Sequence, residues 1–262
     1  MNIRVLGCHG SDEVRDDRGR PVQYRTCGFV LNGAILMDAG TVGTALTLAE
    51  QKRLRHVLLS HLHFDHIQGL PTLADNLAET VKTPVMISSI AEVLDGLKAH
   101  IFNGAVYPDF MKLPTPQLPV FTCRPMEAGK AADVDGLQIT PIRVNHLVPA
   151  VGYLIRDGKA SFLYSGDTYE TEEIWKAAAR EPNLKAAFIE TSFPDEMAEL
   201  ALVSKHLTPA LFAKEFRKIG KPDLPVYIYH IKPRYREAIE RQLAALKMKN
   251  LTLLKEGQEV AI

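Results

Sequence analysis

Apolar and polar positions alternate in short runs through the first forty residues, and these runs predict three successive strands. We expect them at residues 2–7, 28–32 and 34–40, where aliphatic side chains are frequent. Asn32 and Gly33 separate the last two runs, and an Asn-Gly pair in that position favours a tight hairpin turn. The beginning of the chain is therefore expected to be rich in β-structure.

The rest of the chain alternates between helical spacing and short apolar runs. Helices are predicted at residues 41–53, 67–78, 90–97, 170–180, 208–219 and 234–247. Strands are predicted at residues 56–60, 84–88, 137–144, 151–156, 161–165, 186–190, 226–230 and 251–254. A strand-rich, helix-flanked first half followed by a similar second half indicates an α/β fold with two sheets packed face to face and helices outside, four layers in the order αββα.

Residues 101–130 interrupt this alternation, with five prolines and no sustained period (Pro108, Pro114, Pro116, Pro119 and Pro125). Long loops without secondary structure are uncommon unless they are functional or disordered, and the aromatic content of this one argues against disorder. At 262 residues with 46% hydrophobic content, the chain suits one large domain. We therefore expect a single domain over 1–262, with a substrate-covering insertion at about 98–130.

The charge balance limits the classes of binding partner, and the cysteine content bears on the cellular compartment. Lys+Arg and Asp+Glu both total 31, and no block of like charge occurs, so we expect neither a long nucleic acid nor a membrane as partner. A small anionic substrate remains compatible with a neutral chain. Cys8, Cys27 and Cys123 are too few and too scattered for a disulfide framework, and we find no secretory signal or membrane-spanning run, so the expected location is the cytoplasm.

The stretch "SHLHFDH" crowds four potential metal ligands directly behind a predicted strand. His61 and His63 are two residues apart, so in an extended segment both rings would face one metal ion, while Asp65 and His66 follow where the chain turns into a helix and can face a second ion. An isolated buried histidine is usually just hydrogen-bonded. Four polar groups crowded together without a partner would be costly, so the cluster favours metal binding.

Three further candidates follow the ends of predicted strands, namely His146, Asp167 and His230. Strand ends that meet at one sheet edge are a common way to assemble a site. We predict one ion bound by His61, His63 and His146, a second by Asp65, His66 and His230, and Asp167 as a bridge between them; alternatively, Asp167 merely caps a helix. Nitrogen and oxygen ligands suit two divalent ions, zinc first, with manganese or iron also permitted. Two ions held in this way favour hydrolysis.

These stretches resemble the metallo-β-lactamase superfamily. The resemblance rests on "SHLHFDH" (60–66), on "LMDAG" (36–40) before it and on "YSGDT" (164–168) around Asp167. It implies the four-layer metallo-β-lactamase fold. Because this fold hosts many chemistries, it says little about the substrate.

Two later stretches, "SKHLTPALFAKEF" and "YIYHIKPRY", resemble the phosphodiesterase branch, which includes ribonuclease Z and class II 3′,5′-cyclic nucleotide phosphodiesterases. The resemblance implies that His206 is catalytic, that Glu190 orients it and that His230 is a ligand; Asp65 is predicted to be both ligand and catalytic residue. A helix cap is the alternative for His206.

Two other stretches, "LKAHIFNGAVYPDF" and "IETSFPDE", resemble the class II cyclic nucleotide enzymes specifically. Tyr107 or Phe110 could stack on a base and Asn103 could contact the substrate, unless the aromatic residues only anchor the loop to the core. Phe64, Tyr107 and Lys205 stand where class II enzymes tend to have Leu, Trp and Gly.

The sequence thus favours a binuclear metal-dependent phosphodiesterase that hydrolyses 3′,5′-cyclic nucleotides such as cAMP to nucleoside 5′-monophosphates. Three alternatives stay open: a nuclease of the ribonuclease Z type, a hydrolase of another small phosphodiester, and a non-catalytic nucleotide-sensing module. The expected partner is a small phosphodiester. Whether two copies form a homodimer is left open.

Overall fold

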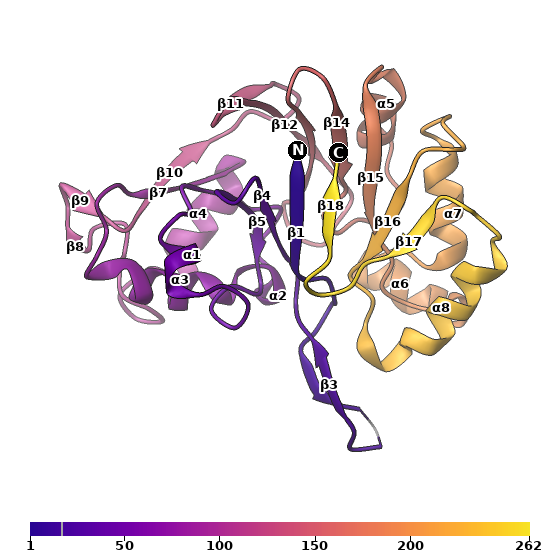
Figure 1. Cartoon of the computed structure of the whole chain (residues 1–262), viewed down its shortest axis with the longest axis horizontal. Helices are drawn as coiled ribbons and strands as arrows, with labels where there is room; N and C mark the ends of the chain where they lie inside the picture. The colour runs from indigo at the N-terminus through magenta and orange to yellow at the C-terminus, as the bar shows by residue number, and fades with distance from the viewer. Residues whose placement is uncertain (17) are drawn as a thin grey trace.

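Two seven-stranded sheets face each other with helices on their outer sides, in the computed structural model that describes residues 1–16 and 18–262 (Figure 1). This is the predicted αββα arrangement. The first sheet has the order β10 (Phe121–Pro125), β7 (Val85–Ser89), β6 (His56–Leu58), β5 (Ile35–Ala39), β4 (Gly28–Leu31), β1 (Asn2–Gly7) and β18 (Glu259–Ala261). The second has the order β11 (Ala132–Val134), β12 (Leu137–Arg143), β13 (Val151–Arg156), β14 (Ser161–Tyr164), β15 (Leu184–Glu190), β16 (Val226–Tyr229) and β17 (Leu251–Leu253).

The helices and the small sheets complete the fold. The helices are α1 (Leu48–Gln51), α2 (Phe64–Ile67), α3 (Gly69–Ala78), α4 (Ala91–His100), α5 (Glu173–Arg180), α6 (Ala198–Ser204), α7 (Pro209–Arg217) and α8 (Arg236–Ala245), with short 3₁₀ turns at Asp195–Met197 and Pro233–Tyr235. Two small hairpins are formed by β2 (Glu13–Arg15) with β3 (Pro21–Tyr24), and by β8 (Pro114–Thr115) with β9 (Leu118–Pro119). In Figure 1 the β2–β3 hairpin projects below both sheets.

Aromatic side chains fill the space between the two sheets. Phe29 of the first sheet meets the rings of Tyr164, Phe188 and Tyr229 of the second edge to face, with centroids 5.6, 6.3 and 5.6 Å apart. Aromatic pairs at these separations add to the free energy gained by burying their large apolar surfaces. A second apolar cluster around Trp175 lies between the second sheet and its outer helices. The two cores hold the facing strand ends in fixed positions.

Turn and cap residues explain where two early elements begin and end. Asn32 and Gly33 have φ angles of 50° and 72°, which confirms the predicted tight hairpin between β4 and β5. The predicted helix at 41–53 is wrong in length, because α1 begins only at Leu48. Thr47 and Glu50 form a capping box that fixes this start. The residues before Thr47 turn over the sheet, with Val42 buried.

Part of the proline-rich segment, which was predicted to be a long surface loop, belongs to the first sheet. Its last part is β10, which pairs in parallel with β7 at the edge of the first sheet. The preceding residues pack their rings onto this sheet, with the centroids of Phe102 and Phe121 5.5 Å apart. The prolines argued against a strand in the sequence, because proline cannot donate a hydrogen bond to a neighbouring strand. At the edge of a sheet this is tolerated, because one side of the strand has no neighbour.

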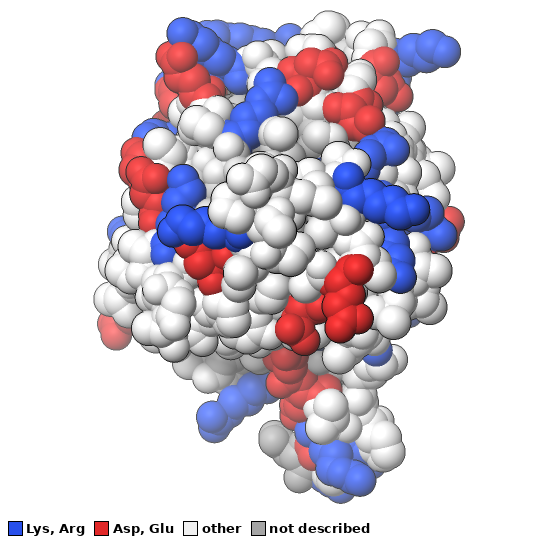
Figure 2. All heavy atoms as spheres, turned by 90° about the vertical axis from the view of Figure 1, so that its left-hand side faces the viewer, with Lys and Arg blue, Asp and Glu red and all other residues white. Residues whose placement is uncertain are grey.

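The surface of the described residues shows no extended basic area on the face that Figure 2 presents, where blue and red side chains are intermixed. No helix in residues 1–16 and 18–262 is long and apolar enough to cross a bilayer.

Candidate metal centre

The predicted metal ligands follow the carboxyl ends of strands in both sheets. The loop after β6 carries the first cluster, and His146, Asp167 and His230 follow β12, β14 and β16. Because the sheets face each other, these ends meet at one edge of the molecule. All the predicted metal ligands are brought together there.

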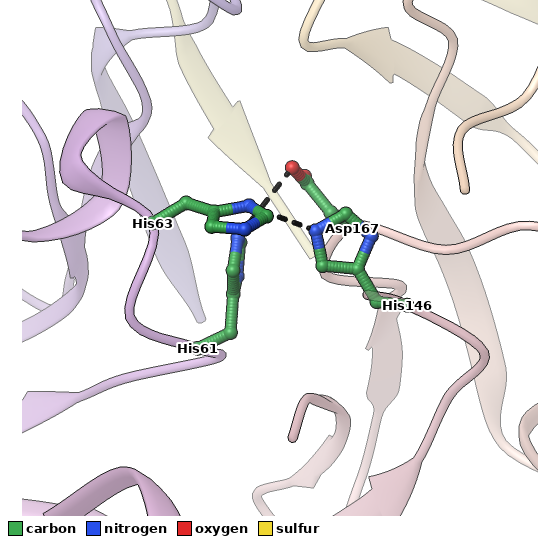
Figure 3. Close-up of side chains that lie close together, drawn as sticks. All are labelled: His61, His63, His146 and Asp167. Atoms are coloured by element: carbon green, nitrogen blue, oxygen red, sulfur yellow. Dashed lines mark hydrogen bonds and ion pairs between the residues drawn. The ribbon is translucent and has the colours of Figure 1, made fainter. Parts of the chain in front are cut away.

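One group consists of His61, His63, His146 and Asp167, whose donor atoms all lie within 4.8 Å of one another. Figure 3 shows the three rings and the carboxylate pointing toward a common point. His63 Nδ1 lies 2.9 Å from His146 Nε2, and His61 Nε2 lies 3.7 Å from Asp167 Oδ2. This is the set predicted for the first ion.

A second group lies on the other side of Asp167. The Nε2 atoms of His66 and His230 approach Asp167 Oδ2 to 3.3 and 3.2 Å, and His230 Nε2 lies 3.1 Å from Asp65 Oδ2. Asp167 is thus shared by both groups, as predicted for a bridging carboxylate. Cys27, which the sequence did not single out, also places its sulfur within 4.8 Å of the donor atoms of His66 and His230.

Outer hydrogen bonds turn most of the rings inward. In four histidines Nδ1 is engaged by a neighbour, which leaves Nε2 facing the centre, and His63 is the exception. The pairs are His61 with Ser60 Oγ at 2.9 Å, His66 with Asp38 Oδ2 at 2.8 Å, His146 with the Lys205 carbonyl at 3.0 Å and His230 with Ser192 Oγ at 2.8 Å. Metal-binding histidines typically have their second ring nitrogen fixed in this way.

Several inward-facing atoms have no hydrogen-bond partner within the described residues. They are Nε2 of His61 and His66 and both carboxylate oxygens of Asp167, all fully buried. Burying polar atoms without partners costs several kcal/mol in general, roughly 2–7 by transfer scales, unless a ligand compensates. Divalent cations fit this donor set, which combines imidazole nitrogens with carboxylate oxygens.

Most of the displaced pKa values among the donors lie in the direction that suits cation binding, and that of His66 is the exception. Burial lowers the pKa of His63 to about 4, with a further contribution from His146, and also lowers that of His61. Burial alone would raise the pKa of Asp65 and Asp167, but the hydrogen bond from His230 to Asp65 and the charges of His230 and His66 beside Asp167 outweigh it and hold both values well below the usual range. His61 and His63 are therefore neutral and the two carboxylates ionised near neutral pH. His66 differs, because the carboxylates of Asp167 and Asp38 outweigh its burial and raise its pKa well above the usual value.

Asp38 is a site residue that the sequence reasoning did not single out. It is the next-to-last residue of β5, has a φ of 50° and is fully buried. Its Oδ2 accepts hydrogen bonds from His66, Ser60 and Tyr164 at 2.8, 2.7 and 2.6 Å. A backbone strained in this way at a buried carboxylate favours a functional role. The available signal was a lone aspartate at the end of an otherwise apolar strand.

His206 and Glu190 form a pair beside the two groups. His206 Nδ1 lies 2.9 Å from Glu190 Oε1, and the His206 and His230 rings stack with centroids 5.1 Å apart. Burial would lower the pKa of His206, but the Glu190 carboxylate outweighs it and raises this pKa. The predicted contact with Glu190 is therefore present. The helix-cap alternative is not, because Thr208 caps α7.

The structure does not support two of the three predicted substrate contacts. Asn103 uses its side chain within its own loop, accepting from the Ala105 and Val106 backbone at 2.9 and 2.8 Å, and the hollow of about 410 Å³ that it lines contains none of the metal donors. Phe110 is 6% exposed and belongs to the core, so the structure favours the anchoring alternative for it. Stacking by Tyr107, which is only partly buried, stays a prediction.

Comparison with known proteins adds family and fold information. The family described as beta-lactamase superfamily domain matches residues 34–231. The structure of unliganded yeast PDE1 superimposes with a TM-score of 0.80 at 17% identity and covers 100% of this chain and 99% of that one. At this identity the likeness concerns the fold.

Two relatives are similar in sequence. A ribonuclease Z from Metallosphaera sedula is 26% identical over 163 residues, which cover 60% of this chain and 49% of that protein. A 3′,5′-cyclic-nucleotide phosphodiesterase from Aliivibrio fischeri is 25% identical over 245 residues, which cover 76% of this chain and 72% of that protein. The chain thus spans about half the length of the first relative and nearly three quarters of the second.

Proposed function

This chain belongs to the beta-lactamase superfamily, and from that premise we propose that it is a metal-dependent phosphodiesterase that hydrolyses small 3′,5′-cyclic nucleotides to nucleoside 5′-monophosphates. The observation that carries the proposal is the His206–Glu190 pair beside a complete set of metal donors. A module that only binds a metal or senses a nucleotide has no need for a buried histidine with a raised pKa at that position.

The donors would hold two divalent ions. His61, His63 and His146 would bind one, Asp65, His66 and His230 the other, and Asp167 would bridge them. Such ions supply positive charge for the phosphate oxygens and lower the pKa of water so that it can act as the nucleophile. Zinc suits the imidazole-rich set best, with manganese or iron as alternatives.

The chain's own residues would manage the leaving group. Glu190 holds His206 through Nδ1, so Nε2 is the atom left to donate a proton. Because Glu190 raises the pKa of His206, the imidazolium form persists closer to neutral pH than it would for a free histidine. A protonated His206 would donate to the 3′-oxygen of the ribose as the phosphorus–oxygen bond breaks.

The relatives and the surface charge support a small phosphodiester. Both relatives are named for enzymes that cleave phosphodiester bonds, in RNA or in cyclic nucleotides. A formal net charge of zero suits a small anion better than a long nucleic acid, which is generally bound through several Lys and Arg contacts to phosphates. The proposal therefore favours the cyclic nucleotide.

A substrate panel tests this function directly. The purified protein, loaded with Zn²⁺ or Mn²⁺, is incubated with 3′,5′-cAMP, 3′,5′-cGMP, a cyclic dinucleotide, a glycerophosphodiester and a precursor tRNA, and products are separated by chromatography. We expect 5′-AMP or 5′-GMP, and loss of the activity on chelation. Processing of the precursor tRNA without cleavage of either cyclic mononucleotide would replace the proposal with a ribonuclease Z-like function.

A further inference from the structure

Lys205 has a backbone conformation that a lysine rarely adopts. It caps the C-terminus of α6 with φ 58° and ψ 53°, in the left-handed region. A residue with a side chain pays about 1–2 kcal/mol for this conformation, which glycine adopts freely. The turn itself does not need a lysine, so the reason for one lies in what its side chain contributes.

The backbone carbonyl and the side-chain ammonium of Lys205 both contact residues near the candidate metal centre. Its carbonyl accepts a hydrogen bond from His146 Nδ1 at 3.0 Å, and His206 follows it in the chain. Its ammonium lies 5.2 Å from the ring centroid of Tyr169. Tyr169 comes two residues after Asp167, and its backbone N–H donates to Asn145 at 2.8 Å. The cation is therefore held at the rim of the site.

This cation is not neutralised by a neighbour. Within residues 1–16 and 18–262, Lys205 has no ion pair and its ammonium donates no hydrogen bond. The nearest carboxylate in sequence to Tyr169 is that of Glu170, which pairs with Lys214 instead. Lys218, the residue that follows the end of α7, is likewise paired, with Glu172 and Glu215 at 2.9 and 2.6 Å. Lys214 and Lys218 thus have carboxylate partners, whereas Lys205 does not.

We propose that Lys205, steadied over the Tyr169 ring, binds a terminal phosphate of the substrate, a second anionic group in addition to the phosphodiester that is cleaved. The inference rests on the proposed phosphodiesterase function and extends its substrate class, because 3′,5′-cAMP has no terminal phosphate and phosphodiesters that carry one would be added to the cyclic nucleotides. Phosphodiesters with such a phosphate are bound more tightly than otherwise identical ones without it. The ring limits the positions the ammonium can take, because a cation over an aromatic face is attracted to it.

A pair of dinucleotides that differ only in the 5′-terminal phosphate, pApA and ApA, tests the inference. Their Kd values are measured by calorimetry on metal-loaded protein carrying His206→Ala, which slows turnover. We expect pApA to bind about tenfold more tightly than ApA, the factor that corresponds to about 1.4 kcal/mol. Adding Lys205→Gly should reduce this ratio to about one, whereas Lys205→Arg should retain most of it. Raising the salt concentration should diminish it.

Lys247 provides a matched control. It also has a left-handed backbone, with φ 54°, just beyond the end of α8. Lys247→Gly relieves the same strain and should leave the pApA-to-ApA ratio unchanged. Equal Kd values for the two dinucleotides before Lys205 is changed, or a ratio that survives Lys205→Gly, would overturn the inference. Failure of the proposed function is recognised separately, as hydrolysis of no phosphodiester by the unmodified protein.

Discussion

Replacing His206 with alanine should remove proton donation to the leaving oxygen while leaving the metal donors in place. The ring is 6% exposed and contacts Glu190 through Nδ1, so it is held in one orientation. A general acid contributes about 10²–10⁴-fold, so kcat for a cyclic nucleotide should fall by that factor, or about 3–5 kcal/mol in activation free energy. Glu190 keeps its hydrogen bonds from the Thr168 backbone and from Ser192, at 3.1 and 2.9 Å, so its carboxylate is not left unsatisfied.

The assay compares two leaving groups and counts the metal ions. Bis(p-nitrophenyl) phosphate releases an acidic phenol that departs without protonation, so His206→Ala should slow its hydrolysis far less than that of cAMP. Metal analysis after dialysis should give the same content in both proteins. If the variant loses an ion, or slows both substrates equally, His206 is a ligand or a phosphate contact, and the acid role is refuted.

Glu190→Gln is the companion variant. Because the Glu190 carboxylate raises the pKa of His206, its loss should lower that pKa. The protonated form would then disappear at a lower pH, so the alkaline limb of the kcat profile should shift toward acid. An unchanged profile would mean that His206 does not titrate in the reaction.

Three further outcomes are expected. Asp38→Asn should weaken metal affinity about 10–100-fold, measured by competition with a chelator, because Asp38 fixes the ring of a candidate ligand through its 2.8 Å contact. Phe110→Ala should lower the free energy of unfolding in urea by about 3–5 kcal/mol without changing KM, whereas Tyr107→Ala should raise KM for cyclic nucleotides if that ring stacks on the base. In metal-free protein, burial lowers the pKa of His61 and His63, to about 4 for His63. At a pH below the ordinary histidine pKa of about 6.5, the unfolded chain therefore binds more protons than the folded one. Stability should therefore fall as pH drops from about 6.5 to about 4, and a Tm that is constant over this range would contradict the assignment.

Local patterns predicted most of the fold, and the failures have physical causes. The hairpin at Asn32 was predictable because its turn chemistry is local. The start of α1 was predicted too early, because residues 41–46 have helical spacing although the helix begins only after the capping box at Thr47. The edge strand Phe121–Pro125 was missed because its pairing with β7 is a contact between distant segments, which no local period records.

For the candidate site, too, local features were predictable and contacts between distant residues were not. The donors could be named from the sequence because a crowded histidine loop and polar residues at strand ends are local signals. The hydrogen bonds that turn four of the rings inward were not predicted, since partners such as Ser192 and His230 are 38 residues apart and meet only in the folded chain. The placement of Phe110 in the core likewise depends on tertiary packing, which the composition of its loop does not reveal.

The donors are divided between the two sheets, and this division bears on how long a bound ion would stay. The loop after β6 belongs to the first sheet, whereas His146, Asp167 and His230 follow strands of the second. An ion held by both would act as a removable cross-link between the halves of the molecule. It would have its full set of donors only after both halves had folded and come together, and parting of the facing loops would remove half of that set. The residence time of the metal would then report how often the two sheets separate at this edge.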